Sequence, residues 1–274
     1  MEICINGKFF PSRRAKVSVL DHGFLYGDGV YDTLRTYEGR FLDPGLHLAR
    51  IRQSASGLGI KIPWSDKQLS GWLQQMVQQN GLGNARVRLT ITRGLNGFDF
   101  TTSKNPTLVI TAERLRPDPA LYKKGVKVIT VNYQRPFPEL KTIGLTVMIL
   151  AHRLMALKKA YEAILIDDAG YVREGTVTNV FMVKNGRLFT PATKILKGIT
   201  RQRVVKLAAK IGLPLAARDF RMTELTKADE IFLTSTVREI IPVTALNGKK
   251  VGKGVPGPVT AKIMQWHRRA IRGL

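Results

Sequence analysis

The sequence predicts an α+β protein that is divided into two domains. Its 274 residues, 44% of them hydrophobic, exceed the size at which a single core usually stops growing, about 250 residues. In the first part of the chain, strand and helix patterns follow one another without the regular βαβ order of a parallel sheet. The segment Arg116-Pro117-Asp118-Pro119 resists both helix and sheet. We therefore predict a small domain over residues 1–118 and a larger one over residues 119–274.

The first domain is expected to contain an antiparallel sheet and two helices. Strand patterns occur at residues 2–10, 16–20, 30–37, 86–92 and 107–111. Residues 46–59 suit a helix. Residues 66–80 suit one better, because their apolar side chains recur every three or four positions, with glutamines opposite. A module with an antiparallel sheet is the simplest account of this pattern.

The second domain shows a similar mixture of patterns. Strands are expected at residues 125–133, 163–167, 180–183, 188–190 and 230–233. Helices are expected at residues 145–160, 199–211 and 258–271. The dipeptides Asn185-Gly186 and Asn247-Gly248 predict two tight hairpins, because both residue types tolerate positive φ.

The chain is strongly basic, with 44 Lys and Arg against 20 Asp and Glu and a formal net charge of +24. Most of this excess lies in the second half, where it is spread thinly. Neither a block of five like charges nor an RNA-stacking motif accompanies it. We interpret it as a solvated surface that attracts anionic substrates and cofactors, and nucleic-acid binding is the weaker alternative.

Simple features disfavour several other classes of protein. No apolar run approaches the ~18 residues of a membrane span, and the N-terminus lacks the basic-then-apolar order of a signal peptide. Cys4 is the only cysteine, so no intrachain disulfide can form. The four histidines share no metal-ligand spacing, so no metal site is expected. These features predict a cytoplasmic protein.

Three segments could together bind a phosphorylated aldehyde. Lys141 follows an extended Pro-rich stretch and precedes an apolar helix, which would place its amine near the interior. Glu174 offers a carboxylate, and residues 196–201 begin a helix whose free N–H groups can bind phosphate. An amine, a carboxylate and an anion site are what a protein needs to hold pyridoxal phosphate by its aldehyde, ring nitrogen and phosphate.

Each segment also has a plainer interpretation. A lysine in so basic a chain is usually a surface charge, and Glu174 beside Gly175 could be a turn residue. Gly-x-Thr before a helix is a common cap. The cluster Thr234-Ser235-Thr236 could reach the same anion, although threonines in sheets are usually structural. Taken singly, these segments do not establish a site.

Taken in order, the segments resemble one family. The chain is similar to the fold-type IV, or class IV, pyridoxal-phosphate aminotransferases, which include branched-chain and D-amino-acid aminotransferases and aminodeoxychorismate lyase. The order and spacing of the motifs are specific even though each motif is weak alone. The motifs are Tyr26-Gly27-Asp28-Gly29-Val30-Tyr31, His47-Leu48-Ala49-Arg50, Glu162-Ala163-Ile164-Leu165, Glu174-Gly175-x-x-x-Asn179, Leu196-x-Gly198-Ile199-Thr200-Arg201, Ala228-Asp229-Glu230, Thr234-Ser235-Thr236 and Ile241-Pro242-Val243.

The resemblance implies a role for each matched residue. The family's Schiff-base lysine falls on Lys141, the carboxylate for the pyridine nitrogen falls on Glu174, and Leu196 packs against the cofactor ring. An ionised Glu174 would keep the ring nitrogen protonated and so make the ring an electron sink. The implied phosphate ligands are Arg50, Ile199, Thr200, Ser235 and Thr236, and the implied substrate-side residues are Tyr31, Arg35, Arg88 and Val237.

The resemblance also implies a fold, a reaction and a partner. The fold is a small antiparallel α/β sandwich joined to a larger domain with a β-barrel-like sheet and flanking helices. The active sites of the family lie between the domains and borrow residues across a homodimer. The reaction is a double displacement, in which Lys141 moves a proton while an amino acid and a 2-oxo acid exchange an amino group.

The substrate is less well defined, because the chain departs from each subgroup. Arg88 matches an arginine of branched-chain enzymes, but Arg86 replaces their aromatic residue and Thr146 replaces a tyrosine. The Arg-x-His pair of D-amino-acid enzymes is absent after Thr92-Arg93-Gly94. Gly144 replaces the asparagine that the lyases usually carry after the lysine motif. We predict a small hydrophobic or branched amino acid as the substrate, with aminodeoxychorismate lyase as the nearest alternative and D-amino-acid transamination behind it.

Overall fold

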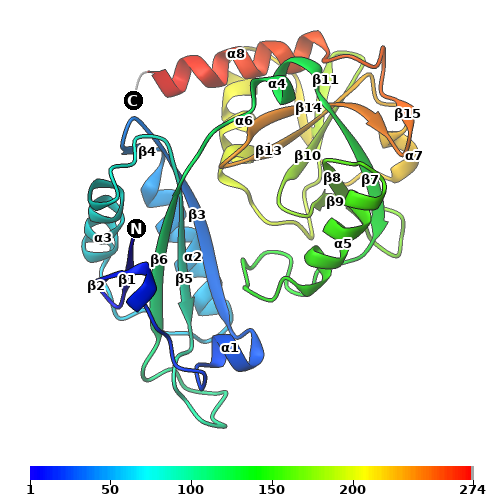
Figure 1. Ribbon diagram of the computed structural model, residues 1–274. Helices are drawn as coiled ribbons and strands as arrows, with labels where there is room; N and C mark the ends of the chain where they lie inside the picture. Colours follow the sequence, from blue (N-terminus) through cyan, green and yellow to red (C-terminus); the bar gives the residue numbers. More distant parts are fainter. Residues whose placement is uncertain (273–274) are drawn as a thin grey trace. The chain divides into compact units, whose positions relative to one another are not determined.

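The computed structural model describes residues 1–272, which form two compact units (Figure 1). Unit 1 comprises Met1–Arg116 together with Leu140–Leu145, and unit 2 comprises Pro117–Glu139 and the residues from Thr146 onward. The chain leaves unit 1 in the proline-rich segment and returns to it once, for the short segment that carries Lys141. That lysine therefore belongs to unit 1, although it follows the prolines in the sequence.

Unit 1 is built on a six-stranded sheet in which all neighbouring strands are antiparallel. The strand order is β2-β1-β6-β5-β3-β4. The strands are β1 (Glu2–Ile5), β2 (Lys8–Pro11), β3 (Gly29–Tyr37), β4 (Arg40–Phe41), β5 (Ala85–Thr92) and β6 (Thr107–Arg114). The helices are the 3-10 turn η1 (Ser12–Arg14), α1 (His22–Tyr26), α2 (Pro44–Gly57) and α3 (Asp66–Gln79).

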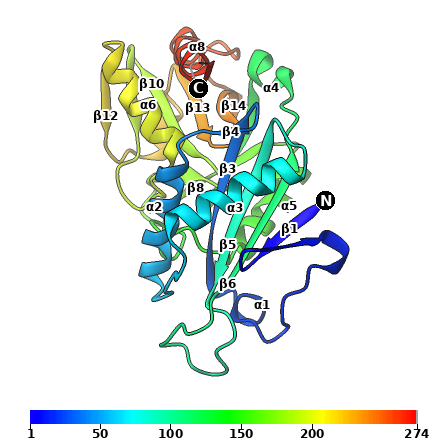
Figure 2. The ribbon, with the colours of Figure 1, turned by 90° about the vertical axis from the view of Figure 1, so that its left-hand side faces the viewer.

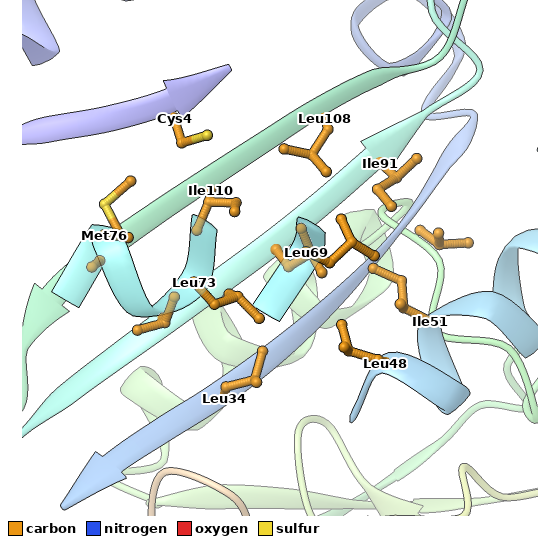
Figure 3. Close-up of a cluster of buried hydrophobic side chains, with 14 of the residues drawn as sticks. Cys4, Leu34, Leu48, Ile51, Leu69, Leu73, Met76, Ile91, Leu108 and Ile110 are labelled. Carbon is orange, nitrogen blue, oxygen red and sulfur yellow. The ribbon is translucent and has the colours of Figure 1, made fainter. Parts of the chain in front are cut away.

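The core of unit 1 lies between one face of this sheet and the helices α2 and α3, and Figure 2 shows α3 crossing the strands. Helix α3 begins with a capping box, in which Ser65 and Gln68 each accept a backbone N–H from the other. Its apolar stripe then meets the alternate inward side chains of the strands. The side chains labelled in Figure 3 are Cys4, Leu34, Leu48, Ile51, Leu69, Leu73, Met76, Ile91, Leu108 and Ile110.

Unit 2 contains a closed barrel. Its strands β13, β14, β7, β8 and β9 form a row, and β10 closes the row into a ring by pairing with both ends, β13 and β9. The ring runs β10-β13-β14-β7-β8-β9 and back to β10, while β11 and β12 extend it from β10 and β15 adds to β14. The strands are β7 (Val126–Asn132), β8 (Glu162–Ile166), β9 (Val172–Gly175), β10 (Asn179–Lys184), β11 (Arg187–Thr190), β12 (Leu215–Ala217), β13 (Glu230–Ser235), β14 (Glu239–Leu246) and β15 (Lys249–Lys250).

Within the described part of unit 2, five helices accompany the barrel. They are α4 (Pro119–Lys124), α5 (Thr146–Leu157), α6 (Ile199–Lys210), α7 (Met222–Leu225) and α8 (Pro258–Arg272). Helices α6 and α8 pack on a cluster whose centre is the stacked pair Phe181 and Phe232, with ring centroids 4.8 Å apart. Buried Glu230 accepts the N–H groups of Val259 and Thr260, so a strand carboxylate caps the start of α8.

The predicted fold class is confirmed, and both Asn-Gly hairpins form. The strand expected at residues 16–20 is wrong, because these side chains are exposed and no partner strand pairs with them. The strand expected at residues 2–10 is a hairpin, since Asn6 and Gly7 adopt φ of 48° and 82°. The short elements α1, α4, α7, β9 and β12 were not predicted.

Within residues 1–272, no helix combines the length and the apolar character that crossing a membrane would require.

The cap on α8 predicts a measurable loss of stability in Glu230→Ala. The carboxylate accepts bonds of 3.0 and 2.7 Å from Val259 and Thr260 N–H, which would lose their acceptor in a buried place. We expect the free energy of unfolding in urea to fall by roughly 2–3 kcal/mol. The matched control is Glu113→Ala, because its carboxylate pairs with Arg86 at the surface and should contribute less than about 1 kcal/mol. Equal losses in both variants would contradict the assignment.

Candidate active site

The backbone of Lys141 is fixed between β3 and α2 in unit 1. Its carbonyl accepts the N–H of Tyr31 at 2.9 Å, and its own N–H donates to Ser54 Oγ at 3.1 Å. Two residues on, Ile143 N–H donates to the carbonyl of Gly29 at 3.0 Å. A side chain on Gly29 would come within 2.9 Å of Ile143, so glycine allows this close approach. The lysine is therefore part of the sheet's framework and not of a loose surface loop.

The amine of Lys141 lies over an aromatic ring. Its Nζ is 4.6 Å from the centroid of the Tyr31 ring, and the guanidinium carbon of Arg88 is 3.8 Å from the same centroid. The lysine is half-buried and Tyr31 is buried. The amine of Lys141 and the guanidinium of Arg88 thus both lie near the same buried ring.

The side chains expected to face a substrate share one face of the unit 1 sheet. Along β3, Val30, Asp32 and Leu34 are in the core layer, so Tyr31 and Arg35 project from the opposite face. In the register with β5, Thr33 pairs with Arg88, which places Arg88 on that same face. The guanidinium of Arg35 lies 4.3 Å from the centroid of the Tyr37 ring.

Arg50 is held by a buried carboxylate that we did not single out from the sequence. Asp32 is fully buried and accepts Arg50 Nε and Nη2, each at 2.8 Å, and His47 Nδ1 lies 2.7 Å from the same carboxylate. Burial alone would raise the pKa of Asp32, but Arg50 and His47 outweigh it and hold that pKa well below its usual range. Arg50 and Ser54 are one helical turn apart on α2, so the guanidinium and the Lys141 backbone are anchored to one helix face.

Glu174 lies at one end of the barrel in unit 2. The register places Glu174 of β9 opposite Asn179 of β10, which is in turn opposite Thr234 of β13. Glu174 is buried, and its Oε2 accepts Leu196 N–H at 3.0 Å and Asn179 Nδ2 at 3.3 Å. Its Oε1 accepts Arg135 Nη1 at 2.7 Å. Glu174 is thus a strand residue surrounded by hydrogen-bond donors, and its interpretation as a turn residue does not apply.

The start of α6 is tied to the same end of the barrel. Asn179 Nδ2 donates to the carbonyl of Leu196 at 2.8 Å. A Cβ on Gly198 would come within 2.0 Å of Asn179 Oδ1, so only glycine fits there. The helix begins at Ile199, and the N–H groups of its first turn have no partner within the helix. Ile199 and Thr200 therefore present a helix N-terminus next to the Leu196 backbone that Glu174 binds.

The remaining predicted residues of unit 2 lie where β13 ends. Ser235 pairs with Glu239 across the turn between β13 and β14, and its Oγ accepts the N–H of Arg238 at 3.2 Å. Thr236 and Val237 lie within this turn. Because Thr234 is opposite Asn179, the turn follows directly from the strand beside Glu174. Unit 2 thus brings together Glu174, Leu196, Ile199, Thr200, Ser235, Thr236 and Val237, while unit 1 carries Tyr31, Arg35, Arg50, Arg88 and Lys141.

A second buried carboxylate, Glu162, supports the strand end that carries Glu174. It is fully buried and accepts the N–H groups of Ala163 and Thr176 at 2.9 and 3.1 Å and the hydroxyl of Thr178 at 3.2 Å. These contacts hold the chain immediately after Glu174. The sequence predicted a strand from residue 163 but no role for Glu162. The available signal was a charged residue at the start of an otherwise apolar strand.

Known proteins resemble the chain over nearly its whole length. Residues 29–246 match the model of the family Amino-transferase class IV. The chain is 37% identical to the "Putative branched-chain-amino-acid aminotransferase" of Methanocaldococcus jannaschii, over 97% of this chain and 94% of that protein. It is 32% identical to a D-alanine aminotransferase of Bacillus licheniformis, over 96% and 94%, and 31% identical to an aminodeoxychorismate lyase of Bacillus subtilis, over 99% and 95%.

Among solved structures, the branched-chain amino acid aminotransferase of T.th. complexed with N-(5'-phosphopyridoxyl)-L-glutamate superposes with a TM-score of 0.93. The identity is 28%, and the match covers 99% of this chain and 94% of that one. The chain belongs to the class IV aminotransferases. It is therefore an enzyme of a family that uses pyridoxal phosphate, and our predictions of the family, the enzyme class and the cofactor are confirmed.

The residues of this chain fit that cofactor. Glu174 is a buried acceptor of the kind a pyridine N–H requires, and the start of α6 is a helix N-terminus suited to phosphate. Beside them, the hydroxyl of Thr234 is buried without a hydrogen-bond partner among the described residues, so polar capacity remains at this end of the barrel. Within residues 1–272, no group of three His, Cys, Asp or Glu side chains could hold a metal ion.

The ion pair of Asp32 predicts how acid acts on this site. Because its pKa is lowered in the folded protein, its stabilising contribution is complete above about pH 4 and is lost as the pH falls further. Asp32→Asn should cost roughly 3–5 kcal/mol at pH 7, and its Tm should fall less than that of the wild type between pH 5 and pH 2.

Thermal unfolding across this pH range checks the prediction. Asp66→Asn is the matched control, because Asp66 pairs with Arg52 at the surface. Its Tm should follow the wild-type curve closely. Curves for Asp32→Asn that run parallel to the wild type down to pH 2 would show that the pKa of Asp32 is not lowered.

Proposed function

We propose that the protein is a transaminase that uses pyridoxal phosphate to move an amino group from a small hydrophobic or branched amino acid to a 2-oxo acid. The observation that carries this proposal is the barrel end of unit 2, where a buried carboxylate, Glu174, is tied through Leu196 to the start of α6. Similarity to the Methanocaldococcus jannaschii relative and to the branched-chain enzyme structure supports the substrate class.

In this proposal, unit 2 binds the ring and the phosphate. Glu174 accepts the N–H of the pyridine ring, and Leu196 packs against the ring face. The N–H groups of Ile199 and Thr200 receive the phosphate, helped by the partial positive charge of the helix N-terminus. The hydroxyls of Ser235 and Thr236 add donors from the neighbouring turn. Arg50 of unit 1 supplies a guanidinium, oriented by Asp32.

Lys141 performs the covalent and proton-transfer work. When bound, pyridoxal phosphate supplies an aldehyde for the amine and an electron sink for the carbanion. The amine of Lys141 would hold the cofactor by its aldehyde and would move a proton at the substrate Cα. Its backbone hydrogen bonds to Tyr31 and Ser54 hold it in place during both tasks.

The sheet face with Tyr31, Arg35 and Arg88 binds the substrate in this proposal. The two guanidiniums suit a carboxylate, which arginine binds in a bidentate manner. Tyr31 offers a buried ring surface to the hydrophobic side chain, and Val237 adds an apolar contact. The face therefore suits an amino acid with one carboxylate and a small apolar side chain.

The alternative function is elimination of pyruvate from aminodeoxychorismate. The Bacillus subtilis lyase is 31% identical over 99% of this chain, which is close to the similarity of the transaminases. Transamination of D-alanine is a third candidate, because the Bacillus licheniformis enzyme is 32% identical. All three reactions would use Lys141 and Glu174, so these residues do not separate them.

One absorbance experiment separates the three reactions. The purified protein, loaded with pyridoxal phosphate, is mixed with L-leucine, L-glutamate or D-alanine, and conversion of the cofactor to its pyridoxamine form is followed. We expect conversion with L-leucine and L-glutamate. Lys141→Ala should slow conversion by at least about 10²–10⁴-fold, because the proton carrier is lost. Conversion with D-alanine alone, or pyruvate release from aminodeoxychorismate without any amino-acid conversion, would overturn the proposal.

We also propose that the protein is a homodimer, because unit 1 exposes a large apolar surface. Helix α1 and the loops beside it are joined by the contacts of Phe100 with His22 and Tyr26, at 5.2 and 5.1 Å between ring centroids. A monomer rarely exposes so many apolar side chains together. The exposed residues are Val17, Val19, Leu20, Phe24, Leu25, Tyr26, Leu95, Phe98 and Phe100.

Charges placed on this surface should separate the subunits. Phe98 is 90% exposed and Phe24 is 69% exposed, so Phe24→Asp with Phe98→Asp should not disturb the core. Light scattering after gel filtration should give a dimer for the wild type and a monomer for the double variant. Val255→Asp, at a residue 61% exposed in unit 2, is the control and should remain a dimer. A monomeric wild type would refute the proposal.

A further inference from the structure

Arg135 makes a close ion pair with the carboxylate proposed to bind the cofactor ring. Its Nη1 lies 2.7 Å from Glu174 Oε1, and the exposed fractions of the two side chains are only 15% and 5%. Arg135 comes from the segment that follows β7, so it reaches Glu174 from a part of unit 2 distant in the sequence. In such surroundings a charge pair interacts strongly, because little water screens it.

The other hydrogen bonds of Glu174 determine which oxygen a ring nitrogen must use. Oε2 already accepts Leu196 N–H at 3.0 Å and Asn179 Nδ2 at 3.3 Å. A carboxylate oxygen accepts about two hydrogen bonds, so Oε2 is filled. A ring N–H must therefore share Oε1 with Arg135. The arginine and the cofactor would be bound to the same atom.

This shared oxygen has a consequence for the proton between Glu174 and the ring nitrogen. If the proton resided on Glu174, a neutral acid would face the guanidinium and the ion pair would be lost. If the proton resides on the nitrogen, Glu174 stays ionised and the pair with Arg135 is kept. The guanidinium of Arg135 contacts Oε1 directly and lies farther from the ring nitrogen. Because Coulomb energy falls with distance, its charge disfavours a proton on Glu174 more strongly than a proton on the nitrogen.

We propose that Arg135 is a positioning residue that keeps the shared proton on the ring nitrogen of pyridoxal phosphate and off Glu174. This inference rests on the proposed function, because it requires Glu174 to bind the ring. It assigns a task to a residue that the sequence did not single out. An opposite charge at this range changes a carboxyl pKa by about 1–3 units, which corresponds to about 10- to 1000-fold in the position of the proton.

The nitrogen itself reports the proton. The protein is loaded with ¹⁵N-labelled pyridoxal phosphate, and the ¹⁵N chemical shift distinguishes a protonated from an unprotonated ring. We expect a protonated ring in the wild type and in Arg135→Lys, which keeps the charge. In Arg135→Gln, which keeps a hydrogen-bond donor but removes the charge, the signal should move to the unprotonated position. An Arg135→Gln signal identical to the wild type would overturn the inference.

A second measurement separates this role from a merely structural one. Dissociation constants are measured for pyridoxal phosphate and for its 1-deaza analogue, which has carbon in place of the ring nitrogen. The wild type should prefer pyridoxal phosphate, and Arg135→Gln should reduce that preference by at least about tenfold. If Arg135 only supports the fold, both affinities fall together and the ratio is unchanged, which would refute the inference.

Two further variants complete the design. Arg218→Gln removes a different arginine–carboxylate pair of unit 2, the one with Glu224, and should change neither the ¹⁵N shift nor the ratio. Arg135→Met is a second neutral variant and replaces Arg135→Gln should that variant not fold. A wild type that does not bind pyridoxal phosphate would overturn the proposed function, whereas a protonated ring in every variant would overturn only the role of Arg135.

Discussion

The proposed active site is organised around one buried charge, the carboxylate of Glu174. A charge removed from water costs several kcal/mol unless it is paired and hydrogen-bonded. Glu174 is stabilised by Arg135, by the Leu196 N–H and by Asn179, and these contacts also place the start of α6 beside it. The same interactions that stabilise the buried carboxylate therefore also build the site proposed for the cofactor ring and its phosphate.

Other buried acids organise the protein in the same way. Asp32 orients Arg50 and His47, Glu162 holds the chain after Glu174, and Glu230 caps α8. The chain has few acids for its many bases, and several of those acids are committed to internal partners. The surface is consequently even more basic than the composition suggests. Such a field favours anionic oxo acids and a phosphorylated cofactor.

The sequence predicted the elements whose patterning is strong and failed where tertiary context decides. Helix α3, strands β5 and β13 and both Asn-Gly hairpins follow from periodicity and turn chemistry. Residues 16–20 resemble a strand but find no partner, because a strand exists only when another strand pairs with it. Strand β9 and helices α4 and α7 are too short to show a hydrophobic periodicity. Barrel closure through the pairing of Glu174 with Asn179 has no local signal at all.

The order of residue types along the chain was enough to indicate the family. It also named the residues that could form the site, because amines, carboxylates and a Gly-x-Thr helix start can be recognised in the sequence itself. Their arrangement came from the folded chain. Folding put Lys141 into unit 1 against Tyr31 and Ser54, made Glu174 a buried anion instead of a turn residue, and brought Arg135 to it. Burial and long-range pairing depend on the register of the strands and on the return of the chain to unit 1 at residues 140–145. No local sequence pattern encodes the register or the return.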